Sequence, residues 1–374
     1  MKVLWYIDAA HVLPSVQQLI KHGHEVEIIF PTWRLDAKQC NLTGMKVHVV
    51  QNYNDLLNDF KLILNNTVFD YYLPSMPDAL TDQVQQILQS HGLPCLSHHA
   101  AKCVSSKFNY YRIWKLLNIP TPKIYQRHTD IEYPCVVKPF RGQAGRDVKV
   151  LQNSNDVDQH IGKPEFLLQQ WINGDVVSLM GTVVNGKIDI DLVYDIETDA
   201  WPWVSETGLV TPSKYSHMVD TVKTYLDNFF QSIKFDNTPF MLDIIVDQNR
   251  DIYFLDFAAR LSINGQFLMQ HGGQTDYVAK VLQRLQQRSI KVQLSHAVLF
   301  RQLGLLPGKI NEISADKNLV DFIYLPEQVV PAVNDDTVYS NGFAIVTGLT
   351  RKEVEDKFKR CIDSIRVTYY NHVD

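Results

Sequence analysis

Short apolar runs alternate with amphipathic stretches in the N-terminal part of the chain. Residues 3–7 form an apolar run followed by a turn, and similar runs recur at 25–30 and 46–50. A helix-type pattern at 15–21 ends before Gly23, the residue type best suited to a left-handed C-terminal cap. This alternation predicts βαβ units built around a parallel sheet.

The pattern changes after residue 100. Residues 105–117 predict a helix, and two prolines soon after it prevent its continuation. Strand-type runs follow, including a pair at 241–246 and 252–257 that a polar turn joins into an antiparallel hairpin. The sequence Thr350-Arg351-Lys352-Glu353 has the form of a capping box and predicts the start of a last helix.

These patterns predict an α/β chain of three units. The expected boundaries are 1–100, 101–290 and 291–374. No repeat, low-complexity tract or flexible linker separates them, so we expect the units to pack against one another.

Composition and charge exclude several classes of function. Of 374 residues, 45% are hydrophobic and 21% charged, which is typical of a soluble globular protein. The net charge of −5 supplies no basic field for nucleic acid or an anionic membrane. The first apolar run stops at Asp8, too early for a signal peptide or a membrane span. Five scattered cysteines without a Cys-x-x-Cys pair favour reduced thiols, so we expect a cytoplasmic protein.

A lysine at the end of an apolar strand precedes a loop that contains glycines. Lys138 is directed by its strand, and Gly142 and Gly145 follow between two arginines. Glycine lets a backbone approach a phosphate closely, so strand, lysine and loop suit a triphosphate lid. The alternative is a hairpin with a cationic turn.

A second candidate element is the end of the strand at 166–170. Its exposed backbone groups could bind an adenine edge, with Trp171 and Ile172 as apolar walls. A buried strand that carries an aromatic residue is the alternative.

Two acids in the late hairpin form the third element. Asp243 lies on the first strand and Asp256 on the second, within an apolar run. Two buried carboxylates that face each other repel unless a cation lies between them, and Mg²⁺ accepts carboxylate, phosphate and water ligands. On this interpretation, an Asp256→Asn variant would abolish turnover and stay as stable as the parent or become more stable. The alternative is a salt bridge from Asp256 to Arg260.

In this order, the three elements resemble the ATP-grasp superfamily. Lys107, within Ser105-Ser106-Lys107-Phe108, looks like the first nucleotide-contacting lysine of that family, and Lys138 like the second. The stretch 169–172 resembles the hinge that holds adenine and ribose. The resemblance covers 103–270 firmly and the two ends more loosely. Gly174–Leu179 and 342–348 are also similar to segments of glycinamide ribonucleotide synthetases, and the latter to biotin-carboxylase-like proteins.

The resemblance implies a set of functional residues. For ATP these are Lys107, Lys138, Arg141, Gly142, Gln143, Gly145, Gln169, Gln170, Trp171, Ile172, Asp175 and Leu255. Asp243 and Asp256 are the implied metal ligands, and Arg260 is the implied catalytic residue.

The resemblance also implies a fold and an activity. The fold is a Rossmann-like pre-ATP-grasp domain, a two-lobed ATP-grasp core and a small α/β cap. The activity is that of an ATP- and Mg²⁺-dependent ligase, which joins a carboxylate to an amine through an acyl-phosphate. Small molecules are then the expected partners, and a homodimer stays open.

Two departures from the family pattern keep other activities open. Ala258 stands where a third metal ligand is usual, and Gln169 where a carboxylate is common. A glycinamide ribonucleotide synthetase-like activity, an ATP-grasp kinase and a non-catalytic nucleotide-binding module are the alternatives. The acidic, aromatic segment 195–206 borders the substrate cleft in the family and suits an ammonium-bearing acceptor, or else is a solvated loop.

Overall fold

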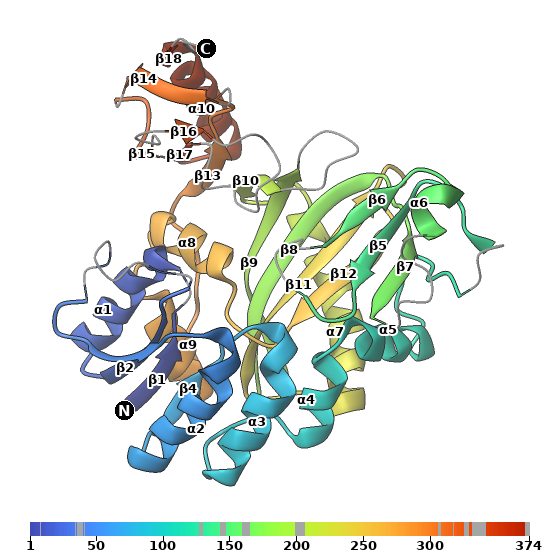
Figure 1. Cartoon of the computed structure of the whole chain (residues 1–374), viewed down its shortest axis with the longest axis vertical. Coiled ribbons are helices and arrows are strands. Elements are labelled where there is room, and N and C mark those ends of the chain that lie inside the picture. The colour runs from blue at the N-terminus through green and yellow to red at the C-terminus, as the bar shows by residue number, and fades with distance from the viewer. Residues whose placement is uncertain are drawn as a thin grey trace.

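In the computed structural model, the described residues form an N-terminal α/β unit and three further sheets (Figure 1). It describes residues 1–7, 9–33, 35, 40, 42–126, 130–142, 147–158, 165–198, 206–305, 308–316, 318–324, 329–330 and 342–370. Among these, no helix has the length and apolar character needed to cross a membrane.

The N-terminal unit is a parallel sheet in the order β3-β2-β1-β4. Its strands are β1 (Lys2–Tyr6), β2 (Glu25–Pro31), β3 (Lys46–Val50) and β4 (Tyr71–Leu73). The helices are α1 (Leu13–Lys21), α2 (Leu56–Asn66) and α3 (Thr81–Ser90), with short 3-10 turns η1 (Ala10–Val12), η3 (Tyr53–Asp55) and η4 (Asp78–Leu80). Alternate residues of β1 pack on opposite faces, since Trp5 joins the core with α1 whereas Leu4 joins the core with α2 and α3. The predicted βαβ organisation is therefore confirmed.

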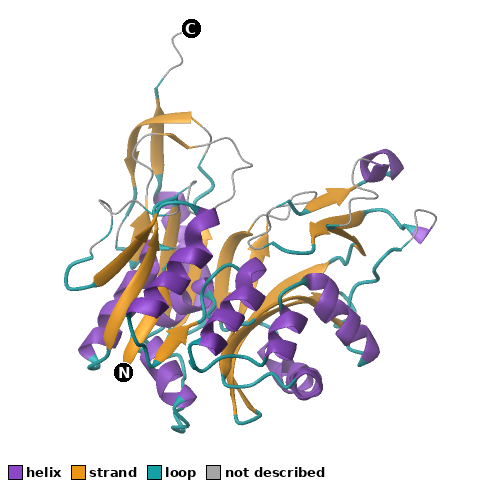
Figure 2. Cartoon of the chain, turned by 60° about the horizontal axis from the view of Figure 1, so that its bottom comes forward, coloured by secondary structure: helices purple, strands orange, loops and turns teal. Residues whose placement is uncertain are grey.

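Two helices and a small antiparallel sheet follow. The expected helix at 105–117 begins at Lys107, because a bend at Ser105 separates α4 (His98–Val104) from α5 (Lys107–Leu116). The small sheet has the order β6-β5-β7, with β5 (Cys135–Pro139), β6 (Lys149–Leu151) and β7 (Phe166–Gln170). Helix α6 (Ser154–Asp158) follows β6. Figures 1 and 2 both place this sheet on the far side of the molecule from the N-terminal unit.

The largest sheet has eight strands in the order β12-β11-β8-β9-β10-β13-β17-β15. Its first five are β8 (Gly174–Val184), β9 (Lys187–Thr198), β10 (Glu206–Thr211), β11 (Thr238–Asp247) and β12 (Ile252–Ala258). The predicted hairpin is confirmed, because β11 and β12 pair antiparallel across a polar turn. Helices α7 (Val219–Ile233), α8 (Ile263–His271) and α9 (Tyr277–Leu285) and the turn η6 (Ser216–Met218) complete this region.

The two faces of the large sheet have different neighbours. Val177 and Leu242 pack with α5 and α7, and we call their side the rear face. Ser178 lies directly opposite both Asp243 and Tyr194 in the strand register. Residues directly opposite in neighbouring strands share a face, so these three define the front face. Tyr194 packs there with α8 and α9.

The C-terminal strands extend the large sheet. Strands β13 (Ala297–Gln302), β17 (Phe343–Gly348) and β15 (Phe322–Tyr324) add to its β10 edge. A separate small sheet contains β14 (Gly308–Ser314), β16 (Val329–Val330) and β18 (Arg366–Tyr369). Helix α10 (Arg351–Ser364) begins as predicted, with the Thr350 side chain accepting a hydrogen bond from the Glu353 amide. The expected unit at 291–374 thus shares a sheet with the preceding one, and its boundary stays a prediction.

Candidate functional site

Lys107 and Asp256 form an ion pair beside the edge strand β12. Lys107 is the first residue of α5, and its Nζ lies 2.7 and 2.6 Å from the two carboxylate oxygens of Asp256. The Tyr110 hydroxyl, one turn later in the helix, also donates to Asp256. Burial opposes ionisation of Asp256, but the Lys107 and Lys138 charges and these hydrogen bonds outweigh it and hold its pKa below the ordinary value.

Arg260 has a different partner from the one considered above. Its Nε lies 2.7 Å from Oδ1 of Asp78, and its Nη2 lies 3.1 Å from Oδ2. Asp78 opens η4 in the N-terminal unit, so this pair joins that unit to the chain just after β12. The alternative of an Asp256–Arg260 salt bridge is therefore wrong, since Asp256 is paired with Lys107 and Arg260 with Asp78. The catalytic role of Arg260 stays a prediction.

Asp243 and Asp256 face each other across the hairpin, as the sequence indicated. They are directly opposite in the register of β11 and β12. Asp243 Oδ1 is buried and has no partner in hydrogen-bonding geometry among the described residues. Burial, and then the neighbouring Asp256 carboxylate, raise the pKa of Asp243 to about 6. An unpaired buried oxygen beside a second carboxylate is a donor set that fits Mg²⁺.

Lys138 is buried in a polar cluster near this pair. Its Nζ donates to the Tyr111 hydroxyl at 3.1 Å and to the Leu255 carbonyl at 3.0 Å. Burial lowers the pKa of Lys138 to about 7, with Asp256 opposing this change and Lys107 adding to it. Gln169, which is 1% exposed, donates to the same Tyr111 hydroxyl at 2.7 Å. The structure thus unites three sequence candidates, Lys138, Gln169 and Leu255.

Tyr111 and Tyr110 were missed by sequence reasoning. Both lie in α5 among buried aromatic side chains, so their spacing indicates a core helix. Only their hydroxyl groups reach the polar cluster, and the sole sequence signal was their closeness to Lys107.

The remaining hinge residues lie at the junction of β7 and β8. The Gln170 amide donates to the Lys123 carbonyl at 2.8 Å, and its side-chain oxygen accepts from the Lys123 amide at 3.3 Å. Trp171 and Ile172 are half-buried in the connection that follows. This connection is where adenine was expected.

The start of the glycine-containing loop lies beside the ion pair of Lys107 and Asp256. The Gly142 carbonyl accepts from Lys107 Nζ at 3.4 Å, which brings this loop to the ion pair. Arg141 donates to the Ala79 carbonyl at 3.1 Å, so its side chain is directed to the N-terminal unit. Gln143 and Gly145 lie outside the described residues.

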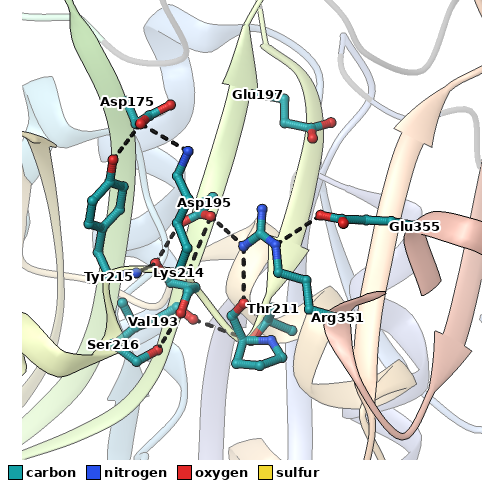
Figure 3. A network of polar contacts seen from close by, with 12 residues as sticks. Asp175, Val193, Asp195, Glu197, Thr211, Lys214, Tyr215, Ser216, Arg351 and Glu355 are labelled. Atoms are coloured by element: carbon teal, nitrogen blue, oxygen red, sulfur yellow. Dashed lines mark hydrogen bonds and ion pairs between the residues drawn. The ribbon is translucent and has the colours of Figure 1, made fainter. Parts of the chain in front are cut away.

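Asp175 does not join the other candidates. Asp175 and Val177 are two positions apart in β8, so their side chains lie on the same face, which is the rear face. Its carboxylate pairs with Lys214 at 2.9 Å and accepts from the Tyr215 hydroxyl at 2.5 Å (Figure 3). The structure therefore separates Asp175 from Asp243, which lies on the front face.

The acidic segment at 195–206 is divided between the two faces. Asp195 is paired with Arg351 of α10 on the rear face (Figure 3), and Glu197 is paired with Arg301. These two acids are neither a solvated loop nor free to bind a substrate. Thr198 is the neighbour of Glu197 in β9, so its side chain lies on the opposite, front face. Glu206 lies directly opposite Thr198 in the register and therefore shares the front face. The tryptophans of this segment, Trp201 and Trp203, lie outside the described residues.

Ala258 ends β12 and is 5% exposed, and it offers no ligand atom. Among the described residues, no group of three or more His, Cys, Asp or Glu side chains is arranged to hold a metal. A cation between Asp243 and Asp256 would therefore need further ligands from elsewhere, such as phosphate oxygens and water.

Comparison with known proteins identifies the domain that contains these residues. The ATP-grasp domain family matches residues 104–264. A carbamoyl-phosphate synthase of Methanobrevibacter smithii is 25% identical over 26% of this chain and 29% of its own length. A 5-formaminoimidazole-4-carboxamide-1-(beta)-D-ribofuranosyl 5'-monophosphate synthetase of Pyrobaculum neutrophilum is 20% identical over 41% of this chain and 50% of its own length. The match thus spans half or less of these curated relatives.

Solved structures resemble the chain over nearly its full length. The L-amino acid ligase of Bacillus licheniformis has a TM-score of 0.80 at 13% identity, with 99% of both chains covered. The phosphoribosylglycinamide synthetase of Anaerococcus prevotii has a TM-score of 0.71 at 15% identity, covering 98% of this chain and 99% of its own. The biotin carboxylase domain of Hydrogenobacter thermophilus 2-oxoglutarate carboxylase, solved with MgADP, has a TM-score of 0.72 at 11% identity, covering 98% and 90%.

The family match and the shared fold agree with the arrangement of Lys107, Lys138, Asp243 and Asp256 in one region. The chain therefore contains an ATP-grasp domain at 104–264, and its overall fold resembles that of the solved ligase and synthetase structures.

Proposed function

We propose that this chain is an ATP- and Mg²⁺-dependent ligase that joins a carboxylate to an amine through an acyl-phosphate. The observation that carries the proposal is the convergence of two buried lysines on two facing aspartates. Lys107 contacts Asp256 directly, and the charges of Lys107 and Asp256 both act on Lys138. Lysine ammonium groups suit phosphate oxygens, and the carboxylates suit Mg²⁺.

Asp243 and Asp256 are the residues that would hold the Mg²⁺ ion. The unpartnered Oδ1 of Asp243 supports this role, and the MgADP bound by the Hydrogenobacter thermophilus protein of the same fold supports the choice of metal. When bound, the ion would supply charge neutralisation on the phosphate oxygens. Lys107, which is hydrogen-bonded to Asp256, would supply its ammonium group to the phosphate oxygens beside that carboxylate.

Other residues would bind the nucleotide. We assign adenine to the hinge at 169–172 and to Leu255. The Leu255 carbonyl accepts a hydrogen bond from Lys138, which brings it into the same polar cluster. The phosphates would lie near Lys107 and the adjoining Gly142. Arg260, held by Asp78, would stabilise the charge that develops during transfer.

The proposed reaction has two steps. A carboxylate oxygen of the first substrate attacks the γ-phosphorus of ATP, and ADP leaves. The nitrogen of an amine then attacks the acyl carbon, phosphate leaves, and the nitrogen loses a proton to give an amide. The fold shared with the L-amino acid ligase of Bacillus licheniformis makes amino acids the first substrates to test. We propose small molecules as partners, and a cytoplasmic setting on the basis of the scattered cysteines; a homodimer stays a prediction.

Trapping with hydroxylamine tests this proposal. The protein is incubated with ATP, Mg²⁺, hydroxylamine and single carboxylates, beginning with the common L-amino acids, and hydroxamate and ADP are measured. We expect equal amounts of both with at least one carboxylate, and none of either in an Asp243→Asn variant. A stable phosphorylated product without hydroxamate would instead identify a kinase.

A non-catalytic nucleotide-binding module is the second candidate, and Ala258 favours it. This residue removes one usual metal ligand from the end of β12. Tight ATP binding in calorimetry, with no ADP or hydroxamate from any carboxylate, would support this candidate over the ligase. The glycinamide ribonucleotide synthetase-like alternative is tested by including glycine with phosphoribosylamine in the panel.

A further inference from the structure

Glu206 is an acid on the front face that the proposed reaction does not yet use. It is the first residue of β10 and is half-buried. Both of its carboxylate oxygens accept from the side-chain amide of Asn264, at 3.1 and 3.0 Å. Asn264 lies in the first turn of α8, whose N-terminus is capped by the Ser262 side chain. The carboxylate is therefore held in place by a neutral group on a capped helix.

The charge of Glu206 lacks a partner within the described part of the chain. No lysine or arginine described there lies within ion-pair distance of it. Two other acids on this sheet differ, since Asp191 is paired with Arg284 and Asp195 with Arg351. An amide donates hydrogen bonds but does not neutralise a charge. Burial and the nearby Asp243 carboxylate accordingly raise the pKa of Glu206 to about 8.

Two further polar atoms on the front face lack a hydrogen bond of good geometry to any described residue, although Ser178 lies close enough to Asp243 to oppose the rise of its pKa. Asp243 Oδ1 and Ser178 Oγ are both buried without a partner in hydrogen-bonding geometry among the described residues, and Ser178 is fully buried. Ser178 is directly opposite Asp243 in the strand register. The front face therefore combines a carboxyl group that lacks a cationic partner among the described residues, Glu206, with polar atoms that lack a well-formed hydrogen bond, as expected of a surface that a polar ligand completes.

We propose that Glu206, positioned by Asn264, binds the ammonium group of a substrate. This inference rests on the proposed ligase function. Asp243 connects the two sites within the sheet, since it shares the front face with Glu206 and lies directly opposite Asp256 in the register of β11 and β12. A substrate held at Glu206 would thus lie close to the phosphoryl-transfer residues. Its chemical class is a primary amine or an amino acid, because an ammonium group supplies both the missing charge and donors for the carboxylate oxygens.

The ammonium group could belong to either substrate, and two assays separate these sources. Hydroxamate formation reports only the carboxylate donor, because hydroxylamine is an uncharged nucleophile at neutral pH. Amide formation with a varied amine reports the acceptor. The variant is Glu206→Gln, which keeps an oxygen for Asn264 and removes the charge. Glu197→Gln is the matched control, since Glu197 lies on the rear face of the same sheet and is paired with Arg301.

If the ammonium group belongs to the acceptor, Glu206→Gln should raise the KM for the amine roughly tenfold or more. Hydroxamate formation should then stay unchanged. If it belongs to an amino-acid donor, the KM for that amino acid should rise by a similar factor in the hydroxamate assay. The KM for the matching carboxylate without an amino group should not change. Glu197→Gln should change neither value. The proposal is overturned if Glu206→Gln alters no KM for an ammonium-bearing compound.

A binding measurement separates this proposal from the proposed function. L-Amino acids and simple primary amines are titrated by calorimetry into the protein saturated with a non-hydrolysable ATP analogue and Mg²⁺. We expect at least one ligand whose affinity falls in both Glu206→Gln and Asn264→Ala. If no hydroxamate forms but an amine still binds in a way that depends on Glu206, the ligase function is refuted and the Glu206 assignment is kept. Absence of binding by any ammonium-bearing compound to the parent protein would refute the Glu206 assignment.

Discussion

The ion pair between Lys107 and Asp256 makes the stability of the metal-free protein depend on Asp256. In an Asp256→Asn variant, Lys107 would keep its charge with a side chain only 9% exposed. Breaking a fully buried pair costs about 3–5 kcal/mol. Asp256 is 35% exposed, so water screens part of this charge, and we expect a loss of about 1–3 kcal/mol in the free energy of unfolding. The sequence-based expectation was unchanged or increased stability, because it took into account only the repulsion between Asp256 and Asp243. The expected change in stability is now in the opposite direction.

The assay is urea unfolding in excess EDTA, followed by tryptophan fluorescence. Lys107→Met and the Lys107→Met/Asp256→Asn double variant complete a cycle with the single variants. Because the double variant leaves neither charge unpaired, we expect it to lose less stability than the sum of the single changes. ATP turnover in excess Mg²⁺ should be lost in each variant. An Asp256→Asn protein as stable as its parent, with additive effects in the cycle, would refute this account of the pair.

Three further predictions concern other parts of the chain. Lys138→Met should weaken ATP binding roughly tenfold or more in calorimetry. Thermal stability should change little, because removing a buried ammonium group, whose pKa burial lowers to about 7, offsets the loss of its hydrogen bonds to Tyr111 and Leu255. Burial opposes ionisation of Glu27, but hydrogen bonds from neighbouring cations outweigh it and lower its pKa from 4.5 to about 2. The contribution of the Glu27 carboxylate to the free energy of unfolding is therefore complete above pH 4.5 and is lost as the pH falls toward 2. Glu27→Gln should reduce the free energy of unfolding at pH 7 by on the order of 3 kcal/mol and make stability depend less on pH in acid. Gly174→Ala would place a Cβ 2.4 Å from the Val246 carbonyl oxygen, so we expect chemical unfolding to show a loss of about 1–3 kcal/mol; unchanged stability would contradict this contact.

Local sequence spacing determined the elements and several of the candidate residues. The apolar runs and the glycine at position 23 predicted the βαβ unit, because strand and helix periods are properties of short segments. Gly23 has a positive φ of 81°, as its expected capping role requires. The polar turn between two apolar strands predicted the hairpin, and with it the opposed positions of Asp243 and Asp256.

Partners far apart in the sequence could not be predicted in this way. Lys107 lies 149 residues before Asp256, and Asp78 lies 182 residues before Arg260. The alternative considered from the sequence paired Asp256 with Arg260, because only nearby charges can be matched by spacing. An ion pair is decided by distance in space, and these distances were set by α5, which reaches Asp256 of β12, and by η4, which reaches Arg260 just after it.

The face on which a side chain lies was also decided by tertiary structure. Asp175, Asp195 and Glu206 all belong to acidic or hinge segments of similar appearance in the sequence. The strand register placed the first two on the rear face, with Tyr215 and Arg351 as partners, and Glu206 on the front face beside Asn264. Because successive residues of a strand point to opposite sides, a shift of one position changes a substrate-facing acid into a structural one. The sequence therefore identifies which acids are present, and the sheet decides which of them can meet a ligand.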